Sequence, residues 1–203
     1  MSGVVRIDGV DTREVDVASL RSEVAFVSDD SFLFSASIAD NIAYARADAT
    51  REQVELAARR AQAHEFVSEL PNGYDTVVGD RGLTLSGGQR QRIAIARALI
   101  ADPRILVLDD ATSSVDARTE AAIKGGLGEA LSGRTTFVVA HRLSTISLAD
   151  EIVVMDGGKI VDRGDHNELL ARCSLYAEIA EHGLEDAVFL QRDLERREEA
   201  ARL

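Results

Sequence analysis

Apolar residues alternate with polar ones at the start of the chain and later recur with helical spacing. The alternation over residues 4–8 predicts a short strand and turn, and residues 24–27 predict a second strand. From residue 37 to residue 70 the apolar positions follow a helical period, and Thr50 is placed to cap a helix there. Residues 71–73 (Pro-Asn-Gly) end this helical stretch.

The second half of the chain changes to an alternation of strands and helices. A Gly-rich loop runs to Gly88, and a helix follows it until Pro103. Short apolar runs with many β-branched residues are then separated by helical stretches, the runs at 105–108, 135–140 and 151–155 and the stretches around 117–131 and 144–149. Strands that alternate with helices predict a parallel sheet. The end of the chain, from Ser174, is predicted to be helical.

Composition narrows the class of protein. A chain of 203 residues that is 45% hydrophobic is long enough for one substantial core or for two lobes. Its apolar runs are far shorter than the roughly 20 residues of a membrane span. No signal peptide is recognisable, and Cys173 is the single cysteine, so we predict a cytoplasmic setting. The net charge of −12 argues against nucleic acid as a partner.

Residues 85–89 read Leu-Ser-Gly-Gly-Gln, directly before a helix predicted to start near Arg90. Glycines let backbone N–H groups approach an anion closely, Ser86 adds a hydroxyl donor, and the helix N-terminus adds a positive dipole. The segment therefore predicts a phosphate-binding loop. An ordinary Ser-Gly-Gly turn is the alternative.

The buried strand predicted at residues 105–108 leads into Asp109 and Asp110. Successive strand residues point to opposite sides, so we predict different tasks for the two carboxylates. Mg²⁺ takes one or two carboxylates together with phosphate oxygens and water, which suits Asp109. Asp110 is then predicted to polarise an attacking water. The alternative is an acidic N-cap for a helix that begins near Asp116.

His141 follows the apolar run 137–140. Parallel sheets bind their ligands at the carboxyl ends of the strands, which makes His141 a candidate site residue. A structural histidine is the alternative.

In this order, the segments resemble the nucleotide-binding domain of ABC exporters over nearly the whole chain. Residues 85–89 are similar to the family's signature motif, and residues 105–110 resemble its Walker B strand. Further segments resemble other parts of the family pattern: 3–11 the strand and turn after the Walker A helix, 27–34 the Q-loop, 76–82 the X-loop of exporters, 113–116 the D-loop with Ser114 and Asp116, and His141 the switch histidine.

The resemblance implies an α/β fold. We expect an incomplete RecA-like (P-loop NTPase) lobe with a parallel sheet at residues 1–34 and 101–172, an ABC-type α-helical subdomain at 35–100, and a C-terminal helical tail at 173–203. It also implies ATP and Mg²⁺ as cofactors. The implied partners are a second nucleotide-binding domain, paired head to tail, and the transmembrane domain of an exporter at the inner face of the cell membrane. In such a dimer the signature residues Ser86, Gly87, Gly88 and Gln89 bind the partner's ATP.

The family's phosphate loop, G-x-x-G-x-G-K-[ST], is missing from the sequence. Lys124 is followed by Gly125 and Lys159 by Ile160, so neither lysine belongs to such a loop. We therefore expect that the chain starts after Walker A and is inactive alone.

Two acidic residues depart from the family pattern. Asp110 stands where the family has its catalytic glutamate, and aspartate there resembles the weak-site subunit of heterodimeric exporters. Asp29 stands where the family has the Q-loop glutamine that contacts Mg²⁺ and senses the transmembrane domain. Asp29 is also a possible Mg²⁺ ligand.

Three functions follow from these patterns. The leading one is the ATP-hydrolysing domain of an ABC exporter that powers solute translocation, as a weak-site subunit. The second is a non-catalytic remnant of such a domain. The third is the C-terminal lobe of a chromosome-maintenance ATPase, which also carries a signature without Walker A. The acidic charge and the lack of a heptad coiled coil before Leu85 argue against the third.

Overall fold

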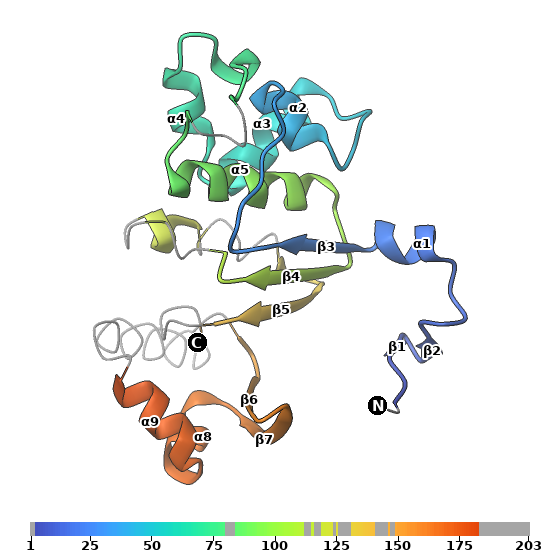
Figure 1. The fold of residues 1–203 in the computed structure, drawn as a ribbon, viewed down its shortest axis with the longest axis vertical. Helices are drawn as coiled ribbons and strands as arrows, with labels where there is room; N and C mark the ends of the chain where they lie inside the picture. The colour runs from blue at the N-terminus through green and yellow to red at the C-terminus, as the bar shows by residue number, and fades with distance from the viewer. Residues whose placement is uncertain are drawn as a thin grey trace, which may run out of the picture. The chain divides into compact units, whose positions relative to one another are not determined.

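Strands and helices follow one another along the chain in the order shown in Figure 1, a computed structural model. The structure describes residues 3–79, 84–111, 115, 119–123, 125, 131–140, 146 and 149–182. The chain divides into two compact units, residues 1–137 and residues 138–203.

The first unit begins with a two-stranded antiparallel hairpin, in which β1 (Arg6–Ile7) pairs with β2 (Val10–Asp11). Asp8 and Gly9 form its turn with φ angles of 50° and 82°, in the left-handed region that glycine and aspartate tolerate best. The predicted strand and turn are therefore confirmed, while the return strand β2 was not predicted. The short helix α1 (Val17–Ser22) leads from the hairpin towards the main sheet.

The main sheet has the strand order β3-β4-β5. β3 (Val24–Val27) and β4 (Ile105–Asp109) are parallel, and Val27 lies opposite Leu108 in their register. β5 (Thr135–Val139) is the neighbour of β4 on the other side. Because β3 and β4 run in the same direction, their carboxyl ends lie at one edge of the sheet. The predicted α/β class with a parallel sheet is confirmed.

The helical segment lies between β3 and β4 in the sequence. Its α-helices in the described part of the chain are α2 (Ile38–Ala43), α3 (Arg51–Arg60), α4 (His64–Glu69) and α5 (Gly87–Ile100). α3 begins with the predicted cap: the Thr50 hydroxyl accepts from the Gln53 amide at 3.3 Å, and Gln53 Oε1 accepts from the Thr50 amide at 2.9 Å. This reciprocal contact fixes where the helix starts.

α5 is the central element of the helical segment. It packs against α2 and α3 on one side and against β3 on the other, and Figure 1 shows it between these helices and the sheet. None of the helices that the structure describes has the length and apolar character of a membrane span. Apolar side chains of this segment are almost fully buried: Ile38, Ile42, Ala58, Val67, Ile93, Ile95 and Ala96.

The second unit contains a β-hairpin and two helices. β6 (Ile152–Asp156) and β7 (Lys159–Gly164) pair antiparallel around a turn at residues 157–158, both glycines with positive φ. β6 was predicted, and β7 was not. α8 (His166–Arg172) and α9 (Ser174–His182) follow. The core of this unit consists of Val154, Leu169, Cys173 and Tyr176.

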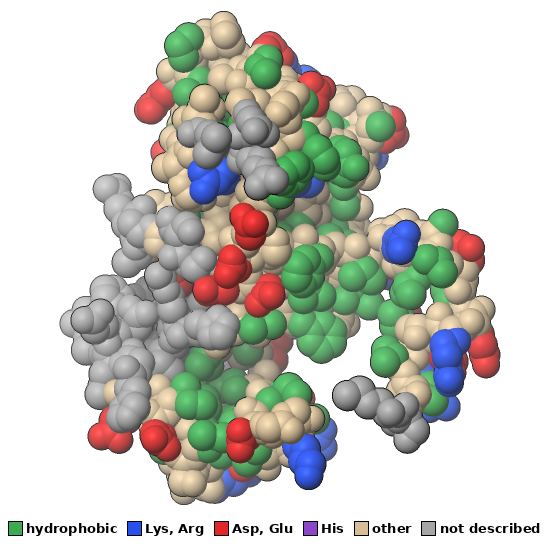
Figure 2. Space-filling model, viewed as in Figure 1, with side chains coloured by type: hydrophobic (Ala, Val, Ile, Leu, Met, Phe, Trp, Pro, Cys, Tyr) green, Lys and Arg blue, Asp and Glu red, His purple; other side chains and the backbone are tan. Residues whose placement is uncertain are grey.

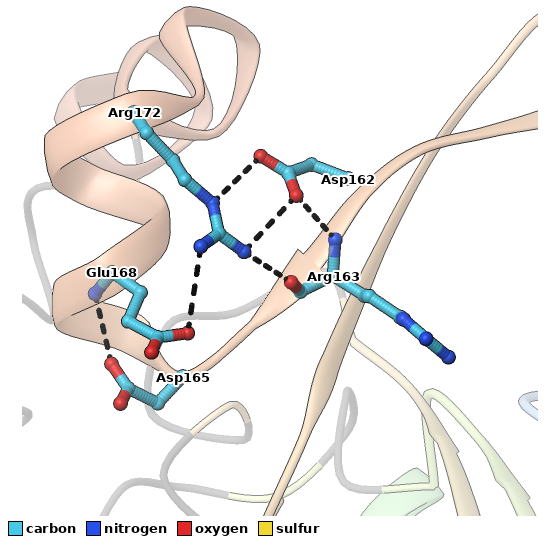
Figure 3. Close-up of polar contacts among 5 residues, drawn as sticks. All are labelled: Asp162, Arg163, Asp165, Glu168 and Arg172. Carbon is cyan, nitrogen blue, oxygen red and sulfur yellow. Dashed lines mark hydrogen bonds and ion pairs between the residues drawn. The ribbon is translucent and has the colours of Figure 1, made fainter.

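Charged side chains join β7 to α8 (Figure 3). The Arg172 guanidinium donates to both oxygens of Asp162 at 3.1 and 3.2 Å and to the Arg163 carbonyl at 2.5 Å. These contacts lower the pKa of Asp162, the side-chain hydrogen bond from Arg172 having the largest effect. Asp165 caps α8 by accepting from the Glu168 amide at 2.8 Å. Exposed ion pairs add little stability, so their main effect is to orient α8 against the hairpin.

A histidine and a tyrosine make the pH-sensitive contact of the second unit. His166 Nδ1 lies 2.7 Å from Tyr176 Oη. Burial lowers the pKa of His166 below its ordinary value of 6.5, against a smaller opposing effect of Asp165, and burial raises the pKa of Tyr176 to about 12. The unfolded chain therefore takes up a proton at a higher pH than the folded one. Stability from this site is complete above about pH 6.5 and is lost as the pH falls through the pKa of folded His166.

We expect the unfolding temperature of the chain to decrease as the pH is lowered from about 7 to about 5. We also expect the imidazole NMR titration of His166 to have its midpoint below 6.5. The matched variant His166→Gln keeps a polar side chain that cannot titrate in this range. The difference between the two unfolding profiles isolates the His166 contribution from that of the carboxylates. Parallel profiles for the two proteins would contradict this assignment.

Candidate functional site

The N-terminus of α5 carries the segment that was predicted to bind phosphate. Ser86 is the N-cap: its Oγ accepts from the Gln89 amide at 3.2 Å, and Gln89 Oε1 accepts from the Ser86 amide at 2.9 Å. The helix begins at Gly87, three residues before the predicted start at Arg90. Both glycines of the segment therefore lie in the first turn of the helix, where the capping contact holds them.

This helix end has the donors that an anion requires. The backbone amides of a first helical turn have no partner within the helix, and the dipole of the 14-residue α5 adds positive potential. The first turn contains no acidic residue that would neutralise it. The Ser86 hydroxyl acts as the acceptor in the capping contact, so its own proton remains to be donated. A phosphate group fits this arrangement.

Two carboxylates stand at the carboxyl end of β4. Asp109 is the last residue of the strand, and Asp110 follows it with a φ of 46°. Both residues are half-buried. Because Asp110 lies outside the strand in a left-handed conformation, this turn sets the direction of its carboxylate, whereas the prediction relied on strand alternation. Figure 2 shows acidic side chains gathered on the viewed face near the ends of β3 and β4.

Asp29 lies two residues beyond β3, at the same edge of the sheet. Since Val27 is paired with Leu108, the chain leaves β3 beside the point where it leaves β4. Within the described residues, no group of three or more His, Cys, Asp or Glu side chains is arranged to hold a metal. Mg²⁺ needs only one or two carboxylates when phosphate oxygens and water complete its shell, and Asp29 and Asp109 have the chemistry of such ligands.

Arg97 on α5 holds the segment that follows β3. Its guanidinium donates to the Asn41 carbonyl at 2.8 Å, to Asn41 Oδ1 at 2.7 Å and to the Phe32 carbonyl at 3.0 Å. It also lies over the rings of Phe34 and Tyr44, at 5.3 and 5.9 Å from their centroids. Burial lowers the pKa of Arg97, with a smaller opposing effect of Tyr44. One side chain thus connects α5, α2 and the Q-loop-like segment.

An open cleft of about 490 Å³ lies next to Arg97. β3 contributes Phe26 to its lining, and the Q-loop-like segment contributes Ser28, Asp30 and Phe32. Phe26 and Phe32 are exposed, at 59% and 48%. The cleft therefore offers apolar rings beside charged groups, at the place where the segment after β3 meets α5.

The X-loop-like segment is described in part. The Ile38 amide donates to the Thr76 carbonyl at 3.0 Å, and Val77 forms an antiparallel bridge with Ser37. These contacts join the start of the segment to α2. Residues 80–82 lie outside the described part of the chain.

Three predicted site residues, His141, Ser114 and Asp116, also lie outside the described residues. Sequence reasoning missed two side chains that the structure brings to the site, Arg97 and Gln91. Gln91 is 1% exposed, and its Nε2 donates to the Asp110 carbonyl at 3.2 Å. A polar residue on the apolar side of a predicted helix was the signal that could have identified it.

Known proteins are similar in sequence to this chain over most of its length. The profile of the family described as ABC transporter matches residues 1–113. The ATP-dependent lipid A-core flippase of Chromohalobacter salexigens is 54% identical over 185 residues, which cover 91% of this chain and 32% of the relative. The protein of the same name from Escherichia coli strain K12 is 54% identical over 178 residues, covering 87% of this chain and 31% of the relative.

The fold has a similar match among solved structures. A bacterial Atm1-family ABC exporter with ATP bound superposes with a TM-score of 0.86 and 48% identity, covering 89% of this chain and 32% of the exporter chain. The chain thus spans about a third of the length of these relatives. The predicted partial RecA-like fold with a parallel sheet and a helical subdomain is confirmed. On these grounds the chain belongs to the ABC transporter family.

Proposed function

We propose that this chain is the ATP-binding and ATP-hydrolysing part of an exporter-type ABC transporter, and that it powers the translocation of a solute across a membrane. One observation carries the proposal: the same compact unit holds a capped helix N-terminus at residues 86–89 and a parallel strand that ends in Asp109 and Asp110. A phosphate site and an acidic edge are the two parts that phosphoryl transfer requires. The identity to ATP-dependent flippases supports it.

The signature end of α5 acts on the nucleotide of a partner. Two nucleotide-binding domains pair head to tail, so that each ATP lies between the Walker A loop of one and the signature of the other. Ser86 contributes its hydroxyl, and Gly87 and Gly88 contribute backbone amides to the partner's γ-phosphate. Gln89 holds Ser86 in place through the capping contact. These donors stabilise the charge that develops in the transition state.

The acidic edge acts on the nucleotide of this chain's own site. Asp109 and Asp29 are the residues that would hold Mg²⁺, which would neutralise phosphate charge when bound with ATP. Asp110 accepts a proton from the water whose oxygen forms the new bond to the γ-phosphorus as the bond to the β-phosphate oxygen breaks. By the family pattern, we assign His141 the role of the switch histidine. Ser114 and Asp116 belong to the D-loop.

This site is the slower of the two in a heterodimer. The Asp110 side chain is one methylene shorter than the glutamate of the family pattern, so its carboxylate lies further back from the water. A general base has to come within about 2.6–3.2 Å of the proton that it removes. We therefore assign the chain to the weak-site subunit, whose partner carries glutamate.

The transmembrane domain of the exporter is the second partner. The cleft beside Arg97, with Phe26 and Phe32 exposed in its lining, is the proposed contact surface. This assignment places the chain in the cytoplasm, at the inner face of the cell membrane. Residues 1–34 and 101–172 then form the RecA-like lobe, residues 35–100 the helical subdomain and residues 173–203 a helical tail.

The isolated chain is expected neither to bind ATP at low micromolar concentration nor to hydrolyse it. The 203 residues contain no G-x-x-G-x-G-K-[ST] loop, so the backbone cradle and the lysine for the β- and γ-phosphates are missing. Calorimetry with Mg·ATP measures this directly. Saturable micromolar binding would show that another segment of the chain supplies the cradle.

The proposed function itself is tested in an assembled exporter in which an upstream segment with the G-x-x-G-x-G-K-[ST] loop is joined to this chain and the partner carries glutamate at its catalytic position. We expect steady-state hydrolysis of Mg·ATP that disappears when Asp110→Asn is combined with the Glu→Gln replacement in the partner. An assembled pair that binds ATP but does not hydrolyse it would favour the non-catalytic remnant.

A further inference from the structure

Gln91 is a polar side chain that is almost fully buried on α5. It lies one turn along α5 from Gly87, is 1% exposed, and is followed in the sequence by the buried Ile93 and Ile95. An apolar side chain of similar length would pack there without the cost of burying an amide. The amide is in contact with the backbone: Nε2 donates to the Asp110 carbonyl at 3.2 Å. The contact joins positions 19 residues apart.

The carbonyl that accepts this bond belongs to a constrained residue. Asp110 has a φ of 46°, a left-handed conformation that is uncommon for a residue with a side chain, although aspartate tolerates it better than most. Holding the carbonyl restrains the peptide plane that follows Asp110, and so restrains the backbone from which the carboxylate projects. The Gln91 amide is therefore one of the contacts that aim Asp110.

We propose that Gln91 is a positioning residue that connects the two nucleotide sites of the dimer through a single chain. The inference rests on the proposed function, in which α5 serves the partner's ATP and Asp110 serves the ATP of its own site. A rigid helix carries any displacement of its phosphate-binding end to Gln91, one turn away. Through its hydrogen bond, Gln91 transmits this displacement to the backbone of Asp110. ATP bound at the partner's site thereby changes the position of Asp110, the general base of this chain's own site.

The kinetic test uses the assembled exporter with Glu→Gln in the partner, so that turnover reports only the Asp110 site. Gln91→Met keeps the length of the side chain and removes the donor. We expect kcat to fall about tenfold with KM for ATP unchanged, because a small misplacement of a catalytic group is costly while the phosphate donors are untouched. Gln53→Met is the matched control, since it removes a capping glutamine from α3.

A double mutant separates positioning from a purely structural role. If Gln91 acts through Asp110, then Gln91→Met changes the residual rate of the Asp110→Asn protein by less than about twofold. A structural role would lower the rate by the same factor in both backgrounds. Equal factors, or an unchanged kcat in the single variant, would overturn the proposal.

A second measurement does not depend on turnover. Hydrogen exchange of the peptide that covers residues 109–111 is expected to speed up in Gln91→Met and to stay as in the unmodified protein in Gln53→Met. An exporter without ATPase activity would refute the proposed function, whereas unchanged exchange at residues 109–111 would refute the link between Gln91 and Asp110.

Discussion

Replacing Gly87 with aspartate is expected to reduce hydrolysis at the partner's site by about 10²–10³, the effect of losing one preorganised donor to a developing oxyanion. Gly87 is the first residue of α5. A carboxylate there repels the γ-phosphate. Steady-state ATPase of a pair that carries Asp110→Asn on this chain measures the partner's site alone.

The same substitution separates loss of function from loss of folding. A negative charge in the first turn of a helix usually stabilises it, by about 0.3–1 kcal/mol. Gly87→Asp should therefore leave thermal stability unchanged or raise it. Val17→Asp is the matched control, because Val17 is the exposed first residue of α1, a helix capped by Asp16 in the same unit. If the two variants had equal ATPase rates, residues 86–89 would not be a phosphate site.

Replacing Asp110 with glutamate is expected to raise turnover at this chain's own site about tenfold, and Asp110→Asn to lower it about 10²-fold, because a positioned general base contributes about 10²–10⁴. The added methylene brings the carboxylate closer to the attacking water. Both rates are measured with Glu→Gln in the partner, which silences the other site.

Asparagine is the informative control at this position. Asp and Asn are the side chains that tolerate left-handed backbone best, so Asp110→Asn keeps the turn at φ 46° and removes only the charge. Glutamate tolerates that conformation less well, and we expect Asp110→Glu to lose some stability while it gains rate. A glutamate variant with unchanged turnover would show that the distance to the water does not limit this site.

Local rules predicted much of the fold. β3 and β4 were located by their apolar runs and turn signals, because a buried parallel strand leaves a short block of branched residues. Thr50 was recognised as a cap because caps depend on neighbours three residues away, whereas Ser86 was predicted only as a phosphate donor and its capping role was missed. The hairpin strands β2 and β7 were missed because two or six residues with mixed exposure carry little periodic signal.

The candidate site was predicted in its motifs but not in its long-range contacts. The contact between Arg97 and Phe32 joins positions 65 residues apart, and the sequence pattern around Arg97 is that of any helix. The contact of Gln91 with Asp110 and the left-handed φ of Asp110 were not predicted for the same reason. Both belong to the place where α5 meets the end of β4. Hydrophobic periodicity predicts which side of a helix or strand is buried, but it does not predict which residues that side contacts.

The parallel pairing of β3 with β4 has a consequence for the order of folding. The paired strands are about 80 residues apart in the sequence, and the whole helical segment lies between them, so β3 closes a long loop when it finds its partner. At about 5–20 residues per second, a ribosome needs several seconds to complete that interval. During those seconds the capped helix α3 can form from local contacts, and α5 is completed just before β4, whereas the edge of β3 stays unpaired. A chaperone that acts on the nascent chain would therefore meet an unpaired apolar strand before it meets a sheet.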